Sequence, residues 1–337
     1  MADITILGSG GFGLALAVLC DGNGHNVTVW SAFQDELDAI IRTGELKAKL
    51  PGVFIPESIK LTSDISCVKD ADLVIIGIPS KFVREVCEKA APFISPKTVI
   101  VNTSKGIEEG SLKRMSQVVE ECFPENKVAV LTGPSHAEEV ARGVPTTVVA
   151  SSECHECAVY VQKTVSGNTF RIYVNDDVVG SEIGGSFKNI IALACGIIDG
   201  MGFGDNTKAA LMTRGIREIA ALGVAMGGKR DTFGGLTGVG DLIVTCTSMH
   251  SRNRRAGILI GQGEEPENAV RKVGTVEGYF CTKTACELCK KMGVEMPITQ
   301  ALGDVLFNGK NVKEAVFELM NRPSKNESED SFLGTGI

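Results

Sequence analysis

Short apolar segments alternate with segments of helical periodicity through the first half of the chain. The spacing of apolar positions predicts helices at 34–42, 81–90 and 111–121. Seven apolar runs predict β-strands, at 4–7, 27–30, 73–76, 98–101, 128–131, 146–149 and 170–173. The runs at 73–76 and 98–101 are almost continuously apolar, which indicates strands that are buried on both faces. The alternation therefore predicts an α/β fold with a doubly wound parallel sheet.

The second half of the chain has few strand signals. Segments rich in alanine, leucine and isoleucine predict helices near 181–198, 207–226, 277–292 and 311–320. A polar turn at 175–177 separates these helices from the last predicted strand. We therefore expect an N-terminal domain at 1–178, a mainly α-helical C-terminal domain at 179–322 and a flexible polar tail at 323–337.

A glycine-rich turn lies between the first predicted strand and an apolar helix. Glycines in such a turn let the backbone approach a pyrophosphate, and the amides and positive dipole end of the helix then hold its charge. The motif predicts that the N-terminal domain is Rossmann-like and binds a dinucleotide. The alternative is a turn that only permits tight packing of helix on strand. The candidate contacts are Gly8, Gly10, Gly11, Phe12 and Gly13.

Composition and charge narrow the class of protein. The chain has 337 residues, of which 43% are hydrophobic and 22% charged, as in soluble globular proteins. Its net charge of -7 argues against nonspecific binding of nucleic acid. The sequence has no uninterrupted apolar run of about 18 residues and no signal peptide at its start, so we expect no membrane span and a cytoplasmic location.

Eleven cysteines are scattered through the chain, many of them within apolar segments. An odd number in this arrangement favours reduced thiols over a disulfide framework. The closely spaced pairs Cys154/Cys157 and Cys286/Cys289 could form a four-thiolate zinc site. Both pairs, however, lie in helix-like segments without the glycines of a zinc knuckle, so we expect no bound metal.

Polar residues follow two predicted strands of the N-terminal domain. Lys105 comes after strand 98–101, and the segment 132–137 follows strand 128–131. The carboxyl ends of parallel strands border the ligand crevice in open α/β sheets, so both segments are candidate ligand contacts. Ordinary surface loops are the alternative for each segment taken alone.

One lysine interrupts an otherwise apolar helix in the C-terminal domain. Lys188 and Asn189 lie within 184–193, a segment that should be buried on nearly all sides. Burial disfavours the charged form of a lysine, which suits it to proton transfer. We predict that Lys188 is a general acid or base; a lysine that extends to a nearby surface is the alternative.

A second glycine-rich segment, at 234–240, leads to Asp241. Thr245 follows one helical turn later, and the basic segment 251–255 comes next. Arginine binds phosphate through two parallel hydrogen bonds, so these residues predict a pocket for an anionic substrate. Asp241 can orient Lys188 if the fold brings them together, or it can cap a helix. Solvent exposure at a helix start is the preferred interpretation of residues 254 and 255.

Together these segments resemble the glycerol-3-phosphate dehydrogenase family, in its soluble NAD(P)-dependent branch. The resemblance extends from the first strand to about residue 320, in the order and spacing of the family's motifs. The matching motifs are GSGGFG at 8–13, TSKGIE at 103–108, GPSHAEEV at 133–140, GGSFKNIIA at 184–192, GVGDLIVTCT at 238–247, SRNRR at 251–255 and VEGY at 276–279.

The resemblance implies reversible reduction of dihydroxyacetone phosphate to sn-glycerol 3-phosphate by hydride transfer. It implies that Lys188 transfers the proton and that Lys105 lies beside both ligands. Lys105 and Asp241 are the further candidate catalytic residues. The implied substrate contacts are Lys105, Gly133, Ser135, Lys188, Asn189, Asp241, Thr245, Ser251, Arg252 and Asn253. The implied cofactor contacts beyond the glycine turn are Lys105, Ala137, Arg252 and Glu277.

The end of the second predicted strand bears on the choice of cofactor. NAD-selective sites commonly place an acid there, about 20 residues beyond the glycine motif, to bind the ribose hydroxyls. This chain has Trp30, Ser31, Ala32 and Phe33 instead. The lack of an acid favours NADP or the use of both NADP and NAD, with Trp30 and Ser31 as further candidate contacts.

Two other functions share parts of this pattern. A hydroxyacid or ketopantoate-type dehydrogenase shares the Rossmann half and a helical lysine, but not the arginine-containing segment or TSKG. A noncatalytic NAD(P)H sensor would be expected to lack Lys188 or the substrate pocket.

Apolar helical surfaces allow a homodimer. Production of glycerol 3-phosphate implies a role in glycerophospholipid precursor synthesis, or in redox balance with carbohydrate metabolism.

Overall fold

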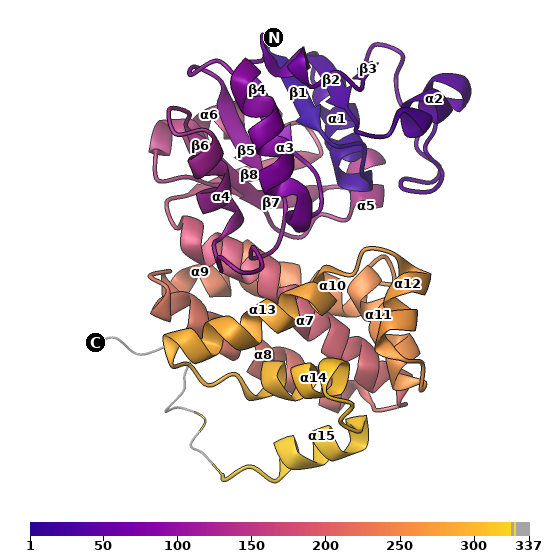
Figure 1. Ribbon diagram of the computed structural model, residues 1–337, viewed down its shortest axis with the longest axis vertical. Coiled ribbons are helices and arrows are strands. Elements are labelled where there is room, and N and C mark those ends of the chain that lie inside the picture. The colour runs from indigo at the N-terminus through magenta and orange to yellow at the C-terminus, as the bar shows by residue number, and fades with distance from the viewer. Residues whose placement is uncertain (325–326, 328–337) are drawn as a thin grey trace. The chain divides into compact units, whose positions relative to one another are not determined.

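The computed structural model describes residues 1–324 and 327, which form two compact units (Figure 1). Unit 1 consists of Met1–Lys105 and Lys113–Val178, and unit 2 of Gly106–Leu112 and the chain from Val179 onward. The chain therefore passes from one unit to the other three times. The expected flexible tail at 323–337 lies outside the described residues, apart from 323, 324 and 327.

Unit 1 is built on one sheet of eight strands in the order β3-β2-β1-β4-β5-β6-β7-β8. The strands are β1 (Asp3–Leu7), β2 (Asn26–Trp30), β3 (Lys60–Thr62), β4 (Leu73–Ile76), β5 (Val99–Asn102), β6 (Val128–Thr132), β7 (Thr146–Ser151) and β8 (Phe170–Asn175). The strand order reverses between β1 and β4, which is the switch point of a doubly wound sheet. The predicted Rossmann-like class is thus confirmed.

Helices cover both faces of the sheet. They are α1 (Gly11–Gly22), α2 (Gln34–Thr43), η1 (Ile65–Val68), η2 (Ser80–Phe82), α3 (Val83–Ala90), η3 (Ala91–Phe93), α4 (Met115–Cys122), α5 (Ala137–Ala141) and α6 (His155–Val165). In β4, Leu73 and Ile75 belong to a hydrophobic cluster with α1 and α6, whereas Val74 and Ile76 belong to one with α3 and α4. Burial on both faces explains the continuous apolar runs.

The last two strands run in the opposite direction to the rest of the sheet. β7 pairs antiparallel with β6, and β8 pairs parallel with β7. The predicted parallel pairing holds for β1 to β6, and the two further strands extend the sheet in the opposite direction. Between β6 and β7 the chain forms only the short helix α5, which packs against α1. This connection does not carry the chain back to the amino end of β6. β7 therefore begins near the carboxyl end of β6 and runs antiparallel to it.

Unit 2 is helical in its described residues. Its elements are α7 (Val178–Gly200), α8 (Asp205–Ala225), α9 (Arg230–Gly234), η4 (Leu236–Gly240), α10 (Asp241–Thr247), α11 (Arg252–Gly261), α12 (Pro266–Val273), α13 (Glu277–Met292), α14 (Pro297–Phe307) and α15 (Val312–Met320). Helix α7 is long and apolar enough to cross a membrane, but 89% of its most apolar stretch is buried inside the protein. It is therefore the core helix of unit 2.

Glycines bring the backbones of α7 and α11 into direct contact. A methyl group added at Gly196 would lie 2.1 Å from the carbonyl oxygen of Arg254, and one at Gly257 would lie 2.2 Å from a carbonyl oxygen of α7. Gly200 and Gly261 repeat the arrangement one turn further along. Since no side chain fits between these backbones, the glycines hold the start of α11 against the middle of α7.

A buried carboxyl group links α8 to α14. Glu218 accepts hydrogen bonds from the backbone amides of Ile298 and Thr299, at 2.7 and 3.2 Å, and from the Thr299 hydroxyl. Burial raises the pKa of Glu218 from its ordinary value of 4.5 to about 7, although these donors and the charge of Arg322 favour the ionised form. Between pH 4.5 and about pH 7, the folded protein therefore holds a proton on Glu218 that the unfolded chain releases.

The position of Glu218 predicts a pH-dependent stability. Between pH 4.5 and about pH 7 the folded state binds more protons at this site, so the free energy of unfolding falls as the pH rises, by up to about 3 kcal/mol. Glu218→Gln should remove this part of the pH dependence. Urea denaturation of both proteins across this range measures the effect, and parallel profiles would contradict the assignment.

Candidate active site

In the glycine turn between β1 and α1, close packing requires glycine at positions 8 and 13. Gly8 has a φ of 125°, and a methyl group there would lie 2.6 Å from the side chain of Ile78. A methyl group at Gly13 would lie 2.3 Å from the carbonyl oxygen of Gly8. Both positions therefore serve the packing of α1 on the strand ends, as expected for the first and last glycines of the motif.

Gly10 is different, because nothing in the surrounding structure requires a glycine there. Its φ is -67°, and an added methyl group would meet only the carbonyl oxygen of Gly77, at an ordinary 3.5 Å. The amides of residues 11 to 13 precede the first bond of α1, in which Leu14 donates to Gly10. Among the described residues no side chain caps this helix. The open position and the amides fit the pyrophosphate of a dinucleotide.

Polar side chains connect the ends of β1 and β2. Ser9 Oγ lies 2.8 Å from Ser31 Oγ and donates to the carboxylate of Glu36, in the first turn of α2. Glu36 also pairs with the ammonium of Lys49 at 2.6 Å. Trp30 is buried and donates its indole N–H to a loop carbonyl. An acid therefore does reach the end of β2, and the sequence interpretation missed it because it comes from the following helix.

The other candidate residues of unit 1 follow β5 and β6. The ammonium of Lys105 lies 3.5 Å from the carbonyl oxygen of Gly133, and the hydroxyl of Ser135 donates to the same oxygen at 3.0 Å. Gly133 has a φ of 140°, which favours glycine. Ala137 begins α5 close to Gly11 of the glycine turn. The structure thus gathers these residues at the carboxyl ends of the parallel strands.

Unit 2 contains a buried ion pair between Lys188 of α7 and Asp241 of α10. The ammonium of Lys188 also donates to the hydroxyl of Thr245 at 2.8 Å, and this hydroxyl donates to the backbone carbonyl of Asp241 at 2.6 Å. Lys188 is 5% exposed, Asp241 1% and Thr245 4%. The ammonium is thus paired inside unit 2 rather than extended to an exposed surface.

Close backbone packing places Asp241 beside α7. The π-helical turn η4 precedes α10 directly, so that Asp241 is the first residue of α10. A methyl group at Gly184 of α7 would lie 2.6 Å from the carbonyl oxygen of Thr237 in η4. One at Gly238 would lie 2.0 Å from the carbonyl oxygen of Phe233. The second glycine-rich segment therefore acts through close packing, which brings the carboxylate within reach of Lys188.

Asn189 links α7 to the starts of two other helices. Its side-chain oxygen accepts a hydrogen bond from Asn253 at 2.9 Å, and the oxygen of Asn253 accepts one from the backbone amide of Gly278 at 2.8 Å. Both asparagine side chains are buried. The next residue back from Gly278 is Glu277, which begins α13. The predicted residues 189, 253 and 277 are thus brought together around one network.

The predicted phosphate-binding segment forms the N-terminus of α11. Ser251 caps this helix, and its hydroxyl accepts a hydrogen bond from the amide of Arg254 at 3.2 Å. Arg252, the first helical residue, is exposed. The interpretation of Arg254 as solvated is wrong, because its guanidinium pairs with Asp199 of α7 at 2.8 Å and donates to the carbonyl of Thr247 at 2.7 Å. Arg254 instead ties the start of α11 to α7.

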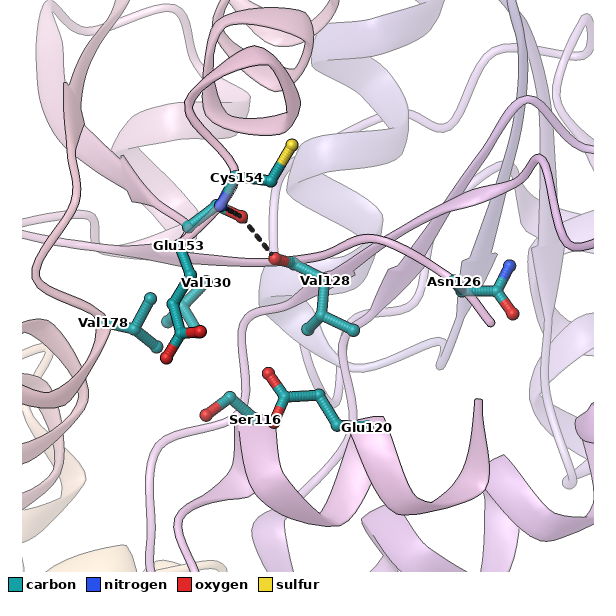
Figure 2. Close-up of a pocket in the computed structure, with 9 residues that line it drawn as sticks. Ser116, Glu120, Asn126, Val128, Val130, Glu153, Cys154 and Val178 are labelled. Atoms are coloured by element: carbon teal, nitrogen blue, oxygen red, sulfur yellow. Dashed lines mark hydrogen bonds between the residues drawn. The ribbon is translucent and has the colours of Figure 1, made fainter. Parts of the chain in front are cut away.

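A cavity in unit 1 lies apart from these residues. In residues 1–324 and 327, no group of three or more His, Cys, Asp or Glu side chains could hold a metal ion. A cavity of about 110 Å³ lies in unit 1 between α4 and the start of β6, where Glu120 and Glu153 approach it from different elements (Figure 2). Ser152 donates to the carbonyl of Val128 beside it. No candidate site residue lines this cavity.

The open glycine turn in unit 1 and the buried lysine in helical unit 2 define a two-domain dehydrogenase of the dinucleotide-binding class. A family model described as the N-terminus of NAD-dependent glycerol-3-phosphate dehydrogenase matches residues 3–158, and the model for the C-terminus matches residues 177–317. The chain belongs to the NAD-dependent glycerol-3-phosphate dehydrogenase family, as the motifs implied.

Individual relatives agree with this family over nearly their full length. Glycerol-3-phosphate dehydrogenase (NAD(P)+) from Fusobacterium nucleatum is 50% identical over 331 residues, 97% of this chain and 99% of the relative. The Bacillus subtilis protein of the same name is 51% identical over 335 residues, 98% of this chain and 97% of the relative. The crystal structure of the Coxiella burnetii glycerol-3-phosphate dehydrogenase has a TM-score of 0.92 and 36% identity, covering 95% of this chain and 99% of that one.

The environment of Gly10 predicts a variant that binds cofactor poorly but folds normally. In Gly10→Ala the new methyl group makes one ordinary contact inside the protein, but it should occupy space that the predicted pyrophosphate needs. We expect the Kd for NADH and NADPH to rise about tenfold or more with little change in Tm. Gly22→Ala is the matched control, because a methyl group at Gly22, the last residue of α1, meets nothing within 4 Å. Unchanged cofactor affinity in Gly10→Ala would refute the placement.

Proposed function

We propose that this protein is an NAD(P)-dependent sn-glycerol-3-phosphate dehydrogenase that reversibly reduces dihydroxyacetone phosphate, with Lys188 as general acid and base. The observation that carries the proposal is the buried group formed by Lys188, Asp241 and Thr245. A lysine so deeply buried is costly unless it is paired or used, and the family of this chain has a reaction that needs a proton donor. Bound NADH or NADPH supplies the hydride.

The contacts of Lys188 suit a reversible proton transfer. When the ketone is reduced, the ammonium donates a proton to the developing alkoxide and becomes a neutral amine. Asp241 and Thr245 hold the nitrogen in place, since each accepts a hydrogen bond from it. In the oxidative direction the amine accepts the proton from the alcohol, and Asp241 stabilises the ammonium that forms.

The start of α11 suits the phosphate of the substrate. Its dipole end, the Arg252 guanidinium and the nearby hydroxyl of Ser251 favour an anion there. Arg252 also serves as a proposed cofactor contact, with Lys105 and Glu277. The phosphate does not react, so its binding energy can position the carbonyl for hydride transfer. Asn189, Asn253, Gly133 and Ser135 complete the proposed substrate contacts.

The direct test follows nicotinamide absorbance with dihydroxyacetone phosphate as substrate. NADH and NADPH are run in parallel, and unphosphorylated dihydroxyacetone is the control. Phosphate-dependent oxidation of either nicotinamide supports the proposed reaction and ranks the cofactors. Cofactor binding without oxidation would instead favour the noncatalytic sensor.

Replacement of Lys188 should abolish turnover without loss of cofactor binding. Lys188→Met leaves Asp241 buried without its partner, so we pair it with the double variant Lys188→Met/Asp241→Asn, which removes both charges. We expect kcat to fall by about 100-fold or more in both proteins, because general acid catalysis is lost. The Kd for NAD(P)H should stay near that of the wild type. Near-normal turnover by a folded double variant would exclude Lys188 as the proton donor.

Replacement of Arg252 should impair recognition of the phosphate. For Arg252→Ala we expect kcat/KM for dihydroxyacetone phosphate to fall about tenfold or more, since a charge-assisted contact is lost, with little effect on unphosphorylated dihydroxyacetone. Arg255→Ala is the matched control, because Arg255 is an exposed arginine on the same helix. If the two variants lost the same activity, or if the preference for the phosphorylated substrate survived in Arg252→Ala, the assignment would fail.

We further propose that the protein is a homodimer in the cytoplasm. Exposed apolar side chains on α14 and α15, among them Phe307 and Phe317, offer surface for association. Light scattering tests this, with a mass of about twice 35.7 kDa expected for the dimer. Formation of glycerol 3-phosphate would supply the synthesis of glycerophospholipids.

A further inference from the structure

The pair formed by Glu36 and Lys49 has no role in the chemistry proposed above, yet it lies next to the glycine turn. Glu36 stands in the first turn of α2, five residues beyond Ser31 at the end of β2. One of its oxygens accepts from Ser9 in the glycine turn, and the other pairs with Lys49 at 2.6 Å. The pair is thus tied to both strand ends by the contacts of Ser9 with Ser31 and Glu36.

Lys49 is held at this place by its neighbours in the chain. The backbone carbonyl of Lys49 would lie 2.7 Å from a methyl group added at Gly11, so the segment passes directly over the glycine turn. Leu46 and Leu50, on either side, are buried in the core of unit 1. The backbone at Lys49 is therefore fixed, whereas its side chain is 34% exposed and its ammonium lies 5.6 Å from the centre of the Phe33 ring.

The carboxylate of Glu36 and the ammonium of Lys49 favour different cofactors at the adenosine end of a dinucleotide. In a Rossmann site the ribose hydroxyls of that end lie beside the end of the second strand. A carboxylate there accepts hydrogen bonds from the hydroxyls of NAD and repels the 2′-phosphate of NADP, while an ammonium attracts that phosphate. The ion pair that links them is partly exposed, and such pairs contribute only about 0–1 kcal/mol, so Lys49 can exchange partners at little cost.

Resting on the proposed function, we propose that Glu36 and Lys49 together set the choice between NAD and NADP, with Glu36 favouring NAD and Lys49 favouring NADP. Each charge offsets the other, so neither cofactor is excluded. This assigns to Glu36 the role of the acid that the sequence lacks at the end of β2, and it accounts for use of both cofactors without an arginine in residues 30–33.

The test measures the Kd for NADH and for NADPH in the absence of substrate, by titration calorimetry at low salt. Glu36→Gln should lower the ratio of Kd(NADPH) to Kd(NADH) by about fivefold or more, because repulsion of the 2′-phosphate is removed. Lys49→Gln should raise the same ratio by about fivefold or more. Both shifts should shrink at high salt, because they arise from charge.

A second ion pair in unit 1 supplies the matched control. Glu85 and Lys89 of α3 are 2.6 Å apart and exposed, so Glu85→Gln and Lys89→Gln make the same charge changes at another place. These variants should leave the ratio unchanged. Equal changes in both Kd values for Glu36→Gln or Lys49→Gln would overturn the inference and assign the pair a structural role. If the wild-type protein bound neither nicotinamide, the proposed function itself would fail.

Discussion

A charged lysine in the core of a helical unit is the constraint on which unit 2 depends. Lys188 is tolerated there because a carboxylate and a hydroxyl accept its hydrogen bonds. Those acceptors can reach it only if α10 begins beside α7, and the glycines at 184 and 238 permit that approach. The buried charge of Lys188 therefore depends on the glycine-rich segment before Asp241, which includes the turn η4. A side chain at Gly184 or Gly238 would move Asp241 away from Lys188 and leave the ammonium without its partner.

In unit 1, the glycines of the turn between β1 and α1 have two different uses. Gly8 and Gly13 hold α1 close to the strand ends, whereas Gly10 leaves space that the protein itself does not fill. In unit 2, by contrast, the positions beside the glycines between α7 and α11 are filled by backbone. The same residue type thus serves packing in one place and access in another, and only the surrounding atoms distinguish the two uses.

The sequence predicted the sheet class and the elements that carry strong apolar periodicity, because the burial that creates those patterns acts within single elements. It did not predict the reversal at β7, which depends on where α5 packs. Strand β3 is three residues long and largely unburied, so its pattern is weak. Helices α9 to α12 and α14 were also missed, being short or irregular in pattern. Short helices are positioned by tertiary contacts more than by their own sequence.

Among the candidate site residues, too, the sequence predicted what a local pattern shows and missed what depends on contacts between elements. Lys188 stood out because a charge in an apolar helix is visible in the sequence. Its pairing with Asp241, 53 positions away, needs the fold. Glu36 was missed because it follows the strand by several residues, and Arg254 was misread because its partner Asp199 lies on another helix. Contacts across elements set the roles of these side chains, and local patterns do not encode them.

The segment 106–112 has a consequence for the order in which the protein can be completed during synthesis. It leaves the ribosome with the strands of unit 1, but Ile107 belongs to the core of unit 2, together with α7 and α13. The side chain of Glu109 likewise pairs with Lys283 of α13. Nascent chains fold as their partners emerge. This short stretch must therefore wait, with an apolar residue still uncovered, until most of the remaining chain has been made.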